Sequence, residues 1–219
     1  MAKDINRVVT LDFESIEGVP DMFTLDPGTM SGWAYYAPVS GKVECGQLGP
    51  RAHQNELLTL IELKLALSVE GRLEVLFERF EFRQFEEELR SQLRGFINGE
   101  LRGGKLRSLS VIIDKLSAIA NSAQTKHKIV LDSREYIGIA KLATQRNGGR
   151  IELASQMPSE ALSFASDNVL DALGWLKPTA GLPHARDALR HLVKRLVSRY
   201  SVKHPITTAC FAAMRPGRS

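Results

Sequence analysis

The chain has 219 residues, of which 43% are hydrophobic and 25% are charged, and its formal net charge is +4. This composition is typical of a globular protein and excludes a chain that is disordered throughout. No apolar run is long enough to span a bilayer, and the first residues lack the apolar core of a signal peptide. We therefore expect no membrane partner and a cytoplasmic location, in a host's cytoplasm if the source is viral. The two cysteines, Cys45 and Cys210, fit no metal or redox spacing and are expected to be reduced.

The first half of the chain predicts short strands and one helix. Residues 8–13 read as a short strand inside a mixed segment, residues 1–20, which we expect to be an N-terminal extension. Tight turns separate three further strands, which predict an antiparallel meander: residues 22–25, 33–37 and 42–48. A helix follows over residues 54–69, where these side chains share one face: Leu57, Leu58, Ile61 and Leu65. Residues 73–82 predict a strand, and the apolar run in its first half suits burial on both faces.

The second half predicts helices and one more strand. Residues 83–107 are charged and interrupted by glycines, so we interpret them as a mobile or partner-contacting excursion. The other predicted elements are a helical segment at 109–119, a fifth strand at 128–131, helices at 135–144, 159–176 and 185–200, and a glycine-rich loop at 147–149. Together the elements predict one α/β domain over residues 21–204, built on a mixed five-stranded sheet covered by helices. Residues 205–219 are expected to be a basic tail.

A carboxylate ends the first strand of the meander. The sequence F-T-L-D-P-G-T-M-S-G-W-A places Asp26 after an apolar strand and before a tight Pro-Gly turn, and a second strand then doubles back. This geometry holds one acid rigidly at the end of a sheet, where it can ligate a divalent metal. Asp12 and Glu14 lack such a turn and are interpreted as surface charges.

Two further acids are candidates for the same site. Glu78 lies on the strand at 73–82, and Asp187 lies near the start of the last helix. If the two strands are neighbours, Asp26 and Glu78 are adjacent, and a helix that crosses their ends adds Asp187. Oxygen ligands of this kind suit Mg²⁺ or Mn²⁺. Two such ions about 4 Å apart can activate a water and stabilise the leaving oxygen of a phosphodiester.

The last helix has an apolar face and a polar face. At 100° per residue, the apolar face carries Leu189, Leu192, Val193 and Leu196. The opposite side carries His184, Asp187 and His191, flanked by Arg190 and Lys194. From residue 177 to the C-terminus there are nine Lys or Arg residues and one acid, which is compatible with a polyanionic partner and equally with a solvated basic face.

Two assignments stay open at this point. If the register of the strand at 73–82 is misread, Glu81 replaces Glu78 as the ligand, because neighbouring strand residues point to opposite faces. Asp171, with Asp167 four residues before it, partly mimics the last motif. Asp187 is preferred because it alone has histidine partners and basic surroundings.

The layout resembles the RuvC-type Holliday junction resolvases of the RNase H-like nuclease superfamily, including their shorter bacteriophage relatives. The resemblance depends on three motifs: D-P-G-T-M-S-G-W-A at 26–34, F-E-R-F at 77–80 and H-A-R-D-A-L-R-H at 184–191. It implies an RNase H-like fold and a metal-dependent endonuclease that cleaves branched DNA and leaves 5′ phosphates. Four-way junctions are the expected substrate, with flaps and forks as further candidates.

The resemblance also implies roles for individual residues. The catalytic metal ligands would be Asp26, Glu78, His184 and Asp187, which would hold two Mg²⁺ or Mn²⁺ ions. Residues expected to contact DNA are Phe80, Phe82, Arg83, Arg186, Arg190, Lys194 and Arg195, with one of the aromatic rings stacking on a base. The enzymes act as homodimers, and residues 109–119 match the position of their dimer helix, with core packing inside one subunit as the equal alternative.

Two other classes of protein are kept as alternatives. Actin-like and sugar-kinase-like ATPases also use a D-x-G-T hairpin, to hold Mg²⁺ and phosphates, although they carry two copies of the fold and are usually longer. A DNA-binding module that has lost catalysis is the second alternative. A zinc site is poorly supported, because no histidine has a cysteine partner at finger spacing.

Overall fold

The computed structural model describes residues 7–28, 30–49, 54–78, 89–95, 98, 109–200 and 205–214. The chain divides into two compact units, one formed by Met1–Arg79 with Arg134–Ser219 and the other by Phe80–Ser133. In the described part of the second unit, residues 89–95 are helical, and residues 109–133 form the first part of helix α3 (Leu109–Arg146). No helix within these described ranges is both long and apolar enough to cross a bilayer.

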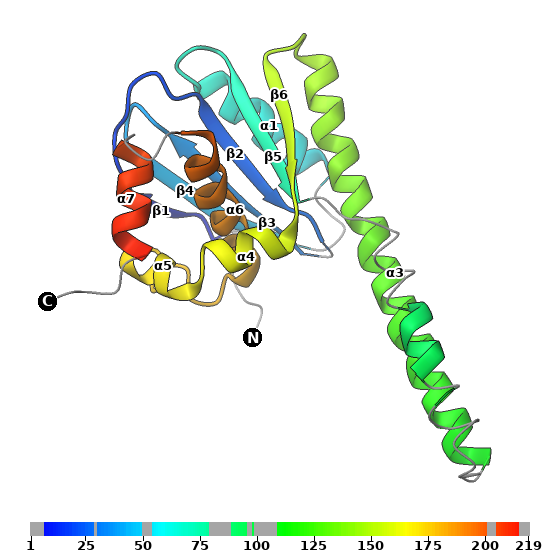
Figure 1. Ribbon diagram of the computed structural model, residues 1–219. Coiled ribbons are helices and arrows are strands. Elements are labelled where there is room, and N and C mark those ends of the chain that lie inside the picture. Colours follow the sequence, from blue (N-terminus) through cyan, green and yellow to red (C-terminus); the bar gives the residue numbers. More distant parts are fainter. Residues whose placement is uncertain are drawn as a thin grey trace, which may run out of the picture. The chain divides into compact units, whose positions relative to one another are not determined.

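The first unit is built on one mixed sheet of six strands in the order β1-β4-β3-β2-β5-β6 (Figure 1). The strands are β1 (Val9–Asp12), β2 (Asp21–Asp26), β3 (Ser31–Ala37), β4 (Lys42–Leu48), β5 (Leu73–Glu78) and β6 (Ile151–Gln156). Strands β2, β3 and β4 form the predicted antiparallel meander, and β1 pairs antiparallel with β4. Strands β5 and β6 continue the sheet in parallel with β2. The prediction of a mixed sheet flanked by helices is therefore confirmed.

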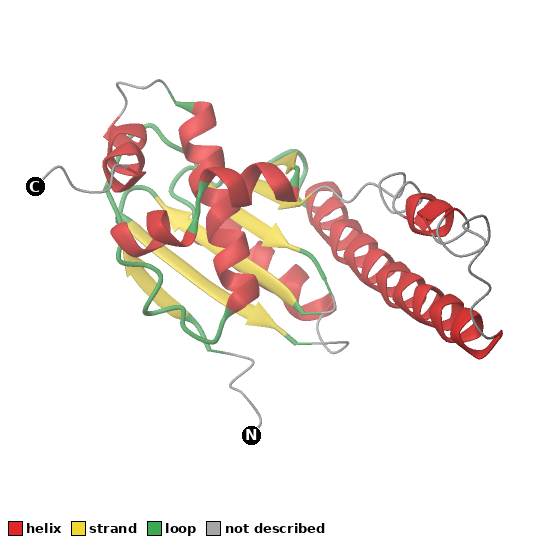
Figure 2. Ribbon diagram, turned by 60° about the horizontal axis from the view of Figure 1, so that its bottom comes forward, coloured by secondary structure: helices red, strands yellow, loops and turns green. Residues whose placement is uncertain are grey.

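Helices cover both faces of the sheet. Helix α6 (Pro183–Arg199) crosses one face (Figure 2), where its buried residues pack with Met22, Ala34 and Tyr36. Helices α5 (Asp167–Ala172) and α7 (Pro205–Met214) belong to the same core through Leu170 and Cys210. Helix α1 (Gln54–Leu67) covers the other face together with the end of α3, in a second core that includes these residues: Phe23, Leu25, Leu57, Ile61, Tyr136 and Ala140.

The alternation of side chains along β2 and β5 decides which residues face α6. Phe23 and Leu25 belong to the core under α1, so their neighbours Thr24 and Asp26 point to the α6 side. The same alternation on β5 assigns Val75 and Phe77 to the α1 side, and therefore Glu78 to the α6 side. Both strands are covered on each face, which explains why β2 is buried along its whole length.

Several boundaries differ from those predicted from the sequence. The sheet has six strands instead of five, because residues 9–12 of the expected N-terminal extension form β1 and contribute core side chains. Residues 128–131 lie inside α3, so the predicted strand there is wrong, and the strand parallel to β5 is β6. A short apolar run fits a strand or a buried helix equally well, and here the helix continues through it.

The C-terminal region also differs. The predicted helix at 159–176 is divided into α4 (Pro158–Phe164) and α5, because the backbone leaves the helical conformation at Ala165 and Ser166. Part of the expected basic tail, residues 205–214, is the helix α7, and its Cys210 is buried in the core with Leu196 of α6. Both cysteines are free thiols, as expected.

Gly32 on β3 pairs with Asp26 on β2, and the backbone of α6 lies close against the sheet there. A Cβ atom on Gly32 would overlap the backbone carbonyl of His184, so Gly32→Ala must push α6 away from β3. We expect a loss of about 3 kcal/mol in the free energy of unfolding, the upper end of the range for overpacking. Chemical denaturation measures this loss.

Gly138→Ala is the matched control, because Gly138 lies in α3 with open space around the position of a Cβ. Alanine favours a helix over glycine by about 1 kcal/mol, so this variant should be slightly more stable than the wild type. Equal stability of the two variants would contradict the close contact between β3 and α6.

Candidate metal centre

Asp26 and Glu78 lie side by side at one edge of the sheet. Strands β2 and β5 are parallel, with Leu25 in register with Phe77, so the next residue of each strand is an acid on the α6 side. Burial raises the pKa of Asp26, and the neighbouring Glu78 carboxylate raises it further. Binding sites in such sheets commonly lie at the carboxyl ends of parallel strands, and the two acids are found there.

Helix α6 brings two more ligands to this edge. Three contacts hold it in place: the His184 backbone N–H donates to Gln47 Oε1 at 2.9 Å, Thr24 Oγ1 donates to the Ala188 carbonyl at 2.8 Å, and Gly32 lets the backbones meet. His184 and Asp187 are separated by three residues, so they lie on the same face of the helix. Both side chains therefore reach the end of β2.

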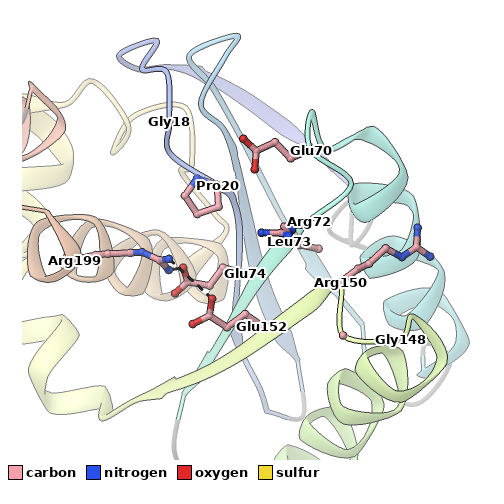
Figure 3. Close-up of a pocket in the computed structure, with 11 residues that line it drawn as sticks. Gly18, Pro20, Glu70, Arg72, Leu73, Glu74, Gly148, Arg150, Glu152 and Arg199 are labelled. Atoms are coloured by element: carbon pink, nitrogen blue, oxygen red, sulfur yellow. Dashed lines mark ion pairs between the residues drawn. The ribbon is translucent and has the colours of Figure 1, made fainter.

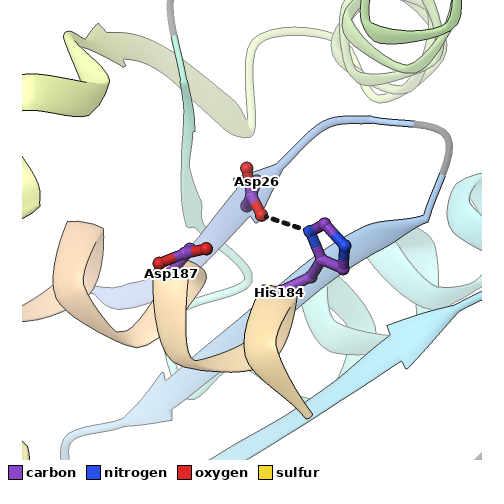
Figure 4. A group of neighbouring side chains, drawn as sticks. All are labelled: Asp26, His184 and Asp187. Atoms are coloured by element: carbon purple, nitrogen blue, oxygen red, sulfur yellow. Dashed lines mark hydrogen bonds and ion pairs between the residues drawn. The ribbon is translucent and has the colours of Figure 1, made fainter. Parts of the chain in front are cut away.

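Asp26, His184 and Asp187 form a compact group of potential metal ligands. One ligand atom from each lies within 4.8 Å of the others, and His184 Nδ1 is 3.1 Å from Asp26 Oδ2 (Figure 4). In the described part of the chain this is the one such group of three. Glu78 borders it without belonging to it, and all four residues line a pocket of about 310 Å³.

The electrostatics of the site favour a bound cation. Burial raises the pKa values of Asp26, Glu78 and Asp187, and for each of them a neighbouring carboxylate adds to the rise. The hydrogen bond to Asp26 raises the pKa of His184. Keeping three carboxylates charged and close together in a partly buried pocket costs free energy. A bound divalent cation lowers this cost because it neutralises their charge.

A second layer of polar residues surrounds Glu78. His191 is only 2% exposed, and its Nε2 lies 3.2 Å from Glu78 Oε2. Its Nδ1 lies 2.9 Å from Oε1 of Gln156, at the end of β6. Burial lowers the pKa of His191, so the ring is neutral at physiological pH. His191 therefore connects the end of β6 to the acid at the end of β5.

Arg190 is the polar partner of Asp187, as His191 is of Glu78. Its guanidinium pairs with both Asp187 and Asp167, and its Nε donates to the Ala165 carbonyl at 3.1 Å. The Arg190 side chain is 11% exposed. Arg190 thus acts as a counter-ion inside the pocket.

The other cations of α6 that were expected to contact DNA also have partners within the protein. Arg195 pairs with Glu74 on β5, Arg186 donates to the Thr179 carbonyl at 3.3 Å, and the Lys194 ammonium lies 4.8 Å from the centre of the Phe164 ring. The expected roles of Phe80, Phe82 and Arg83 fall on residues outside those described, as does the alternative ligand Glu81. DNA contact by these residues stays a prediction.

The remaining alternatives from the sequence can be located. Asp171 is exposed on α5 and lies outside the three-residue ligand group, whereas Asp167 pairs with Arg190. Asp12 pairs with Lys42 on the surface, in agreement with its interpretation as a surface charge. The sequence did not assign roles to Gln156 or to the contact between His191 and Glu78. The helix face shared by His184 and His191 was a sequence signal for the contact between His191 and Glu78. Gln156 had no such signal, because β6 was not predicted.

A larger pocket of about 640 Å³ lies at the opposite edge of the sheet (Figure 3). Its charged residues largely neutralise one another, since Arg199 pairs with both Glu74 and Glu152. These ion pairs attach the end of α6 to β5 and β6. Pocket volume therefore does not identify the functional site, and the group of potential metal ligands favours the smaller pocket.

The chain was compared with known proteins. No protein-family model matches it, and neither does any curated protein or solved structure. Whether a metal ion fits the site is therefore judged from the ligand atoms that the site offers. Carboxylate oxygens and an imidazole nitrogen are common metal ligands in proteins, and the crowded acids favour a cation, so the residues present fit a divalent ion.

The metal-free protein should become less stable as pH rises. The raised pKa values of Asp26, Glu78 and Asp187 mean that the folded state holds more protons than the unfolded state above the ordinary carboxyl pKa of about 4. Stability is therefore lost as pH rises through this window, and the loss persists at neutral pH. Asp26→Asn should raise the melting temperature in EDTA at neutral pH and flatten the pH dependence, measured by thermal denaturation.

Mn²⁺ should reverse the order of the two melting temperatures, because it should stabilise the wild type and not Asp26→Asn. The control is Asp21→Asn, which changes a buried acid at the other end of β2 and should keep the Mn²⁺ gain. A wild type whose metal-free stability increases with pH from about 5 to 8 would contradict the crowding of the acids.

Proposed function

We propose that the protein is a divalent-metal-dependent endonuclease that cleaves branched DNA, of the RuvC-like type with an RNase H-like fold. The observation that carries the proposal is the convergence of Asp26, His184 and Asp187, with Glu78 beside them. These are the four residues that the sequence resemblance implies as catalytic ligands. They come from three separate parts of the chain, so their meeting is a consequence of the fold and not of sequence proximity.

The architecture supports the same proposal. The meander β2–β3–β4, continued by parallel β5 and β6, agrees with the antiparallel-plus-parallel sheet that the resemblance implies. Helix α6 crosses the sheet so that its N-terminal turn meets the ends of β2 and β5. The additional strand β1 extends the opposite side of the sheet and does not alter the end that carries the acids.

Mg²⁺ or Mn²⁺ held by Asp26, Glu78, His184 and Asp187 would supply Lewis-acid activation of water and charge stabilisation at the phosphate. The protein's own groups then have distinct tasks. The hydrogen bond between His184 and Asp26 fixes the orientation of both ligands. Arg190 neutralises Asp187 and lies in the same pocket, from which its guanidinium can donate hydrogen bonds to a phosphate oxygen. Arg186 lies directly before Asp187 and Lys194 lies further along α6; both are partly exposed and are suited to bind the DNA backbone.

Cleavage of a labelled four-way junction is the direct test. With Mg²⁺ or Mn²⁺ the wild type should produce nicked duplexes with 5′ phosphates, and activity should disappear in EDTA. Asp26→Asn and Glu78→Gln should lower the rate by about 10³-fold, since metal catalysis contributes several kcal/mol and each 1.36 kcal/mol corresponds to a tenfold change in rate.

Asp21→Asn is the matched control, because it alters the same strand far from the site and should cleave at the wild-type rate. Flap and fork substrates in the same assay identify the preferred branch. Full cleavage by Asp26→Asn would refute the assignment. Hydrolysis of ATP with no cleavage of any branched DNA would instead indicate an actin-like or sugar-kinase-like ATPase.

A further inference from the structure

We infer that His191, supported by Gln156, is a positioning residue that holds Glu78 as the ligand of a second divalent cation. This inference rests on the proposed function, because the second ion at the site is implied by the resemblance behind that proposal. It concerns His191 and Gln156, to which the resemblance assigns no role.

The geometry separates Glu78 from the other ligands. Asp26, His184 and Asp187 form the compact group, with mutual distances within 4.8 Å, and Glu78 lies outside it. Glu78 Oε2 instead lies 3.2 Å from His191 Nε2, and β5 carries Glu78 beside Asp26 at the end of β2. One ion would be held by Asp26, His184 and Asp187, and the second ion that the resemblance implies would be held by Glu78 together with Asp26.

Hydrogen-bond accounting assigns a direction to the contacts of His191. A carboxylate that ligates a metal can only accept hydrogen bonds, so His191 Nε2 must carry the hydrogen and donate it to Glu78. In the structure Gln156 Oε1 lies 2.9 Å from Nδ1 of the ring, and turning the side-chain amide over brings its NH₂ group to that place as a donor to a bare Nδ1.

Burial makes this chain of contacts effective. His191 is 2% exposed and Gln156 is 9% exposed, so bulk water cannot easily replace either partner. The ring is also fixed by its helix, since Leu192 and Val193 beside it are fully buried in the core. Residues that orient a metal ligand in this way typically contribute about 10- to 100-fold to metal affinity.

The test is a Mn²⁺ titration of the full chain by isothermal calorimetry, with electron paramagnetic resonance to detect spin coupling between two neighbouring ions. The wild type should bind two ions. His191→Phe keeps a planar ring but has no donor, and it should weaken the second ion by about 10- to 100-fold while the first changes little. His191→Gln retains an N–H donor near the position of Nε2 and should restore most of the second affinity.

Two further variants complete the design. Gln156→Met removes the amide and should weaken the second ion in the same direction, so it carries the test if His191→Phe does not fold. Asp21→Asn is the matched control, because it changes a buried acid at the other end of β2 and should leave both affinities unchanged.

The outcomes are distinguishable. Unchanged binding of the second ion in both His191→Phe and Gln156→Met would overturn the inference, as would equal loss of both ions or a wild type that binds one ion. Two ions with the expected dependence on His191, but no cleavage of branched DNA, would refute the proposed function and leave the ligand assignment standing.

Discussion

The candidate site depends on the close contact between α6 and the sheet at Gly32. This glycine is paired with Asp26 across β2 and β3, and the missing side chain gives the His184 backbone room to lie against β3. The contact places the first turn of α6 over the ends of β2 and β5, where His184 and Asp187 meet the two strand acids. The ion pairs between Arg195, Arg199 and Glu74 hold the other end of the same helix on β5. A helix held at both ends can present ligands with the precision that metal binding requires.

The carboxylates of the site repel one another and are partly buried, and a bound cation would lower the free-energy cost of both. Asp26, Glu78 and Asp187 are packed together in a partly buried pocket, and each has a raised pKa because burial disfavours its charged form. Arg190 offsets part of this cost by pairing with Asp187, and the contact between His184 and Asp26 offsets another part. Such local instability is common at functional sites, because groups that must bind a ligand cannot be fully satisfied without it. The core of the domain, formed on both faces of the sheet, supplies the stability that this arrangement requires.

Much of the site could be predicted from the sequence because its ligands lie at element ends with strong local signals. Asp26 ends an apolar strand before a Pro-Gly turn, Glu78 follows an apolar run, and His184 and Asp187 share a face of an amphipathic helix. Gln156 could not be predicted, because β6 is an edge strand paired only with β5 and its sequence, I-E-L-A-S-Q, has a weak strand pattern. The run K-I-V-L at 128–131 has the opposite property: its residues are typical of a strand, but they lie within the long helix α3, so the predicted strand was wrong. Pairing across the sheet and the length of a helix are tertiary constraints that a local pattern does not contain.

The central claim is that Asp26, His184 and Asp187, with Glu78 adjacent, form a divalent-cation site. A crystal structure of the protein grown with Mn²⁺, with diffraction recorded near the manganese absorption edge, tests it most directly. The account predicts an anomalous difference peak between the side chains of Asp26, His184 and Asp187, and a second peak between Asp26 and Glu78. Manganese bound only elsewhere on the protein, with Asp26 and His184 still hydrogen-bonded and no peak beside them, would contradict it.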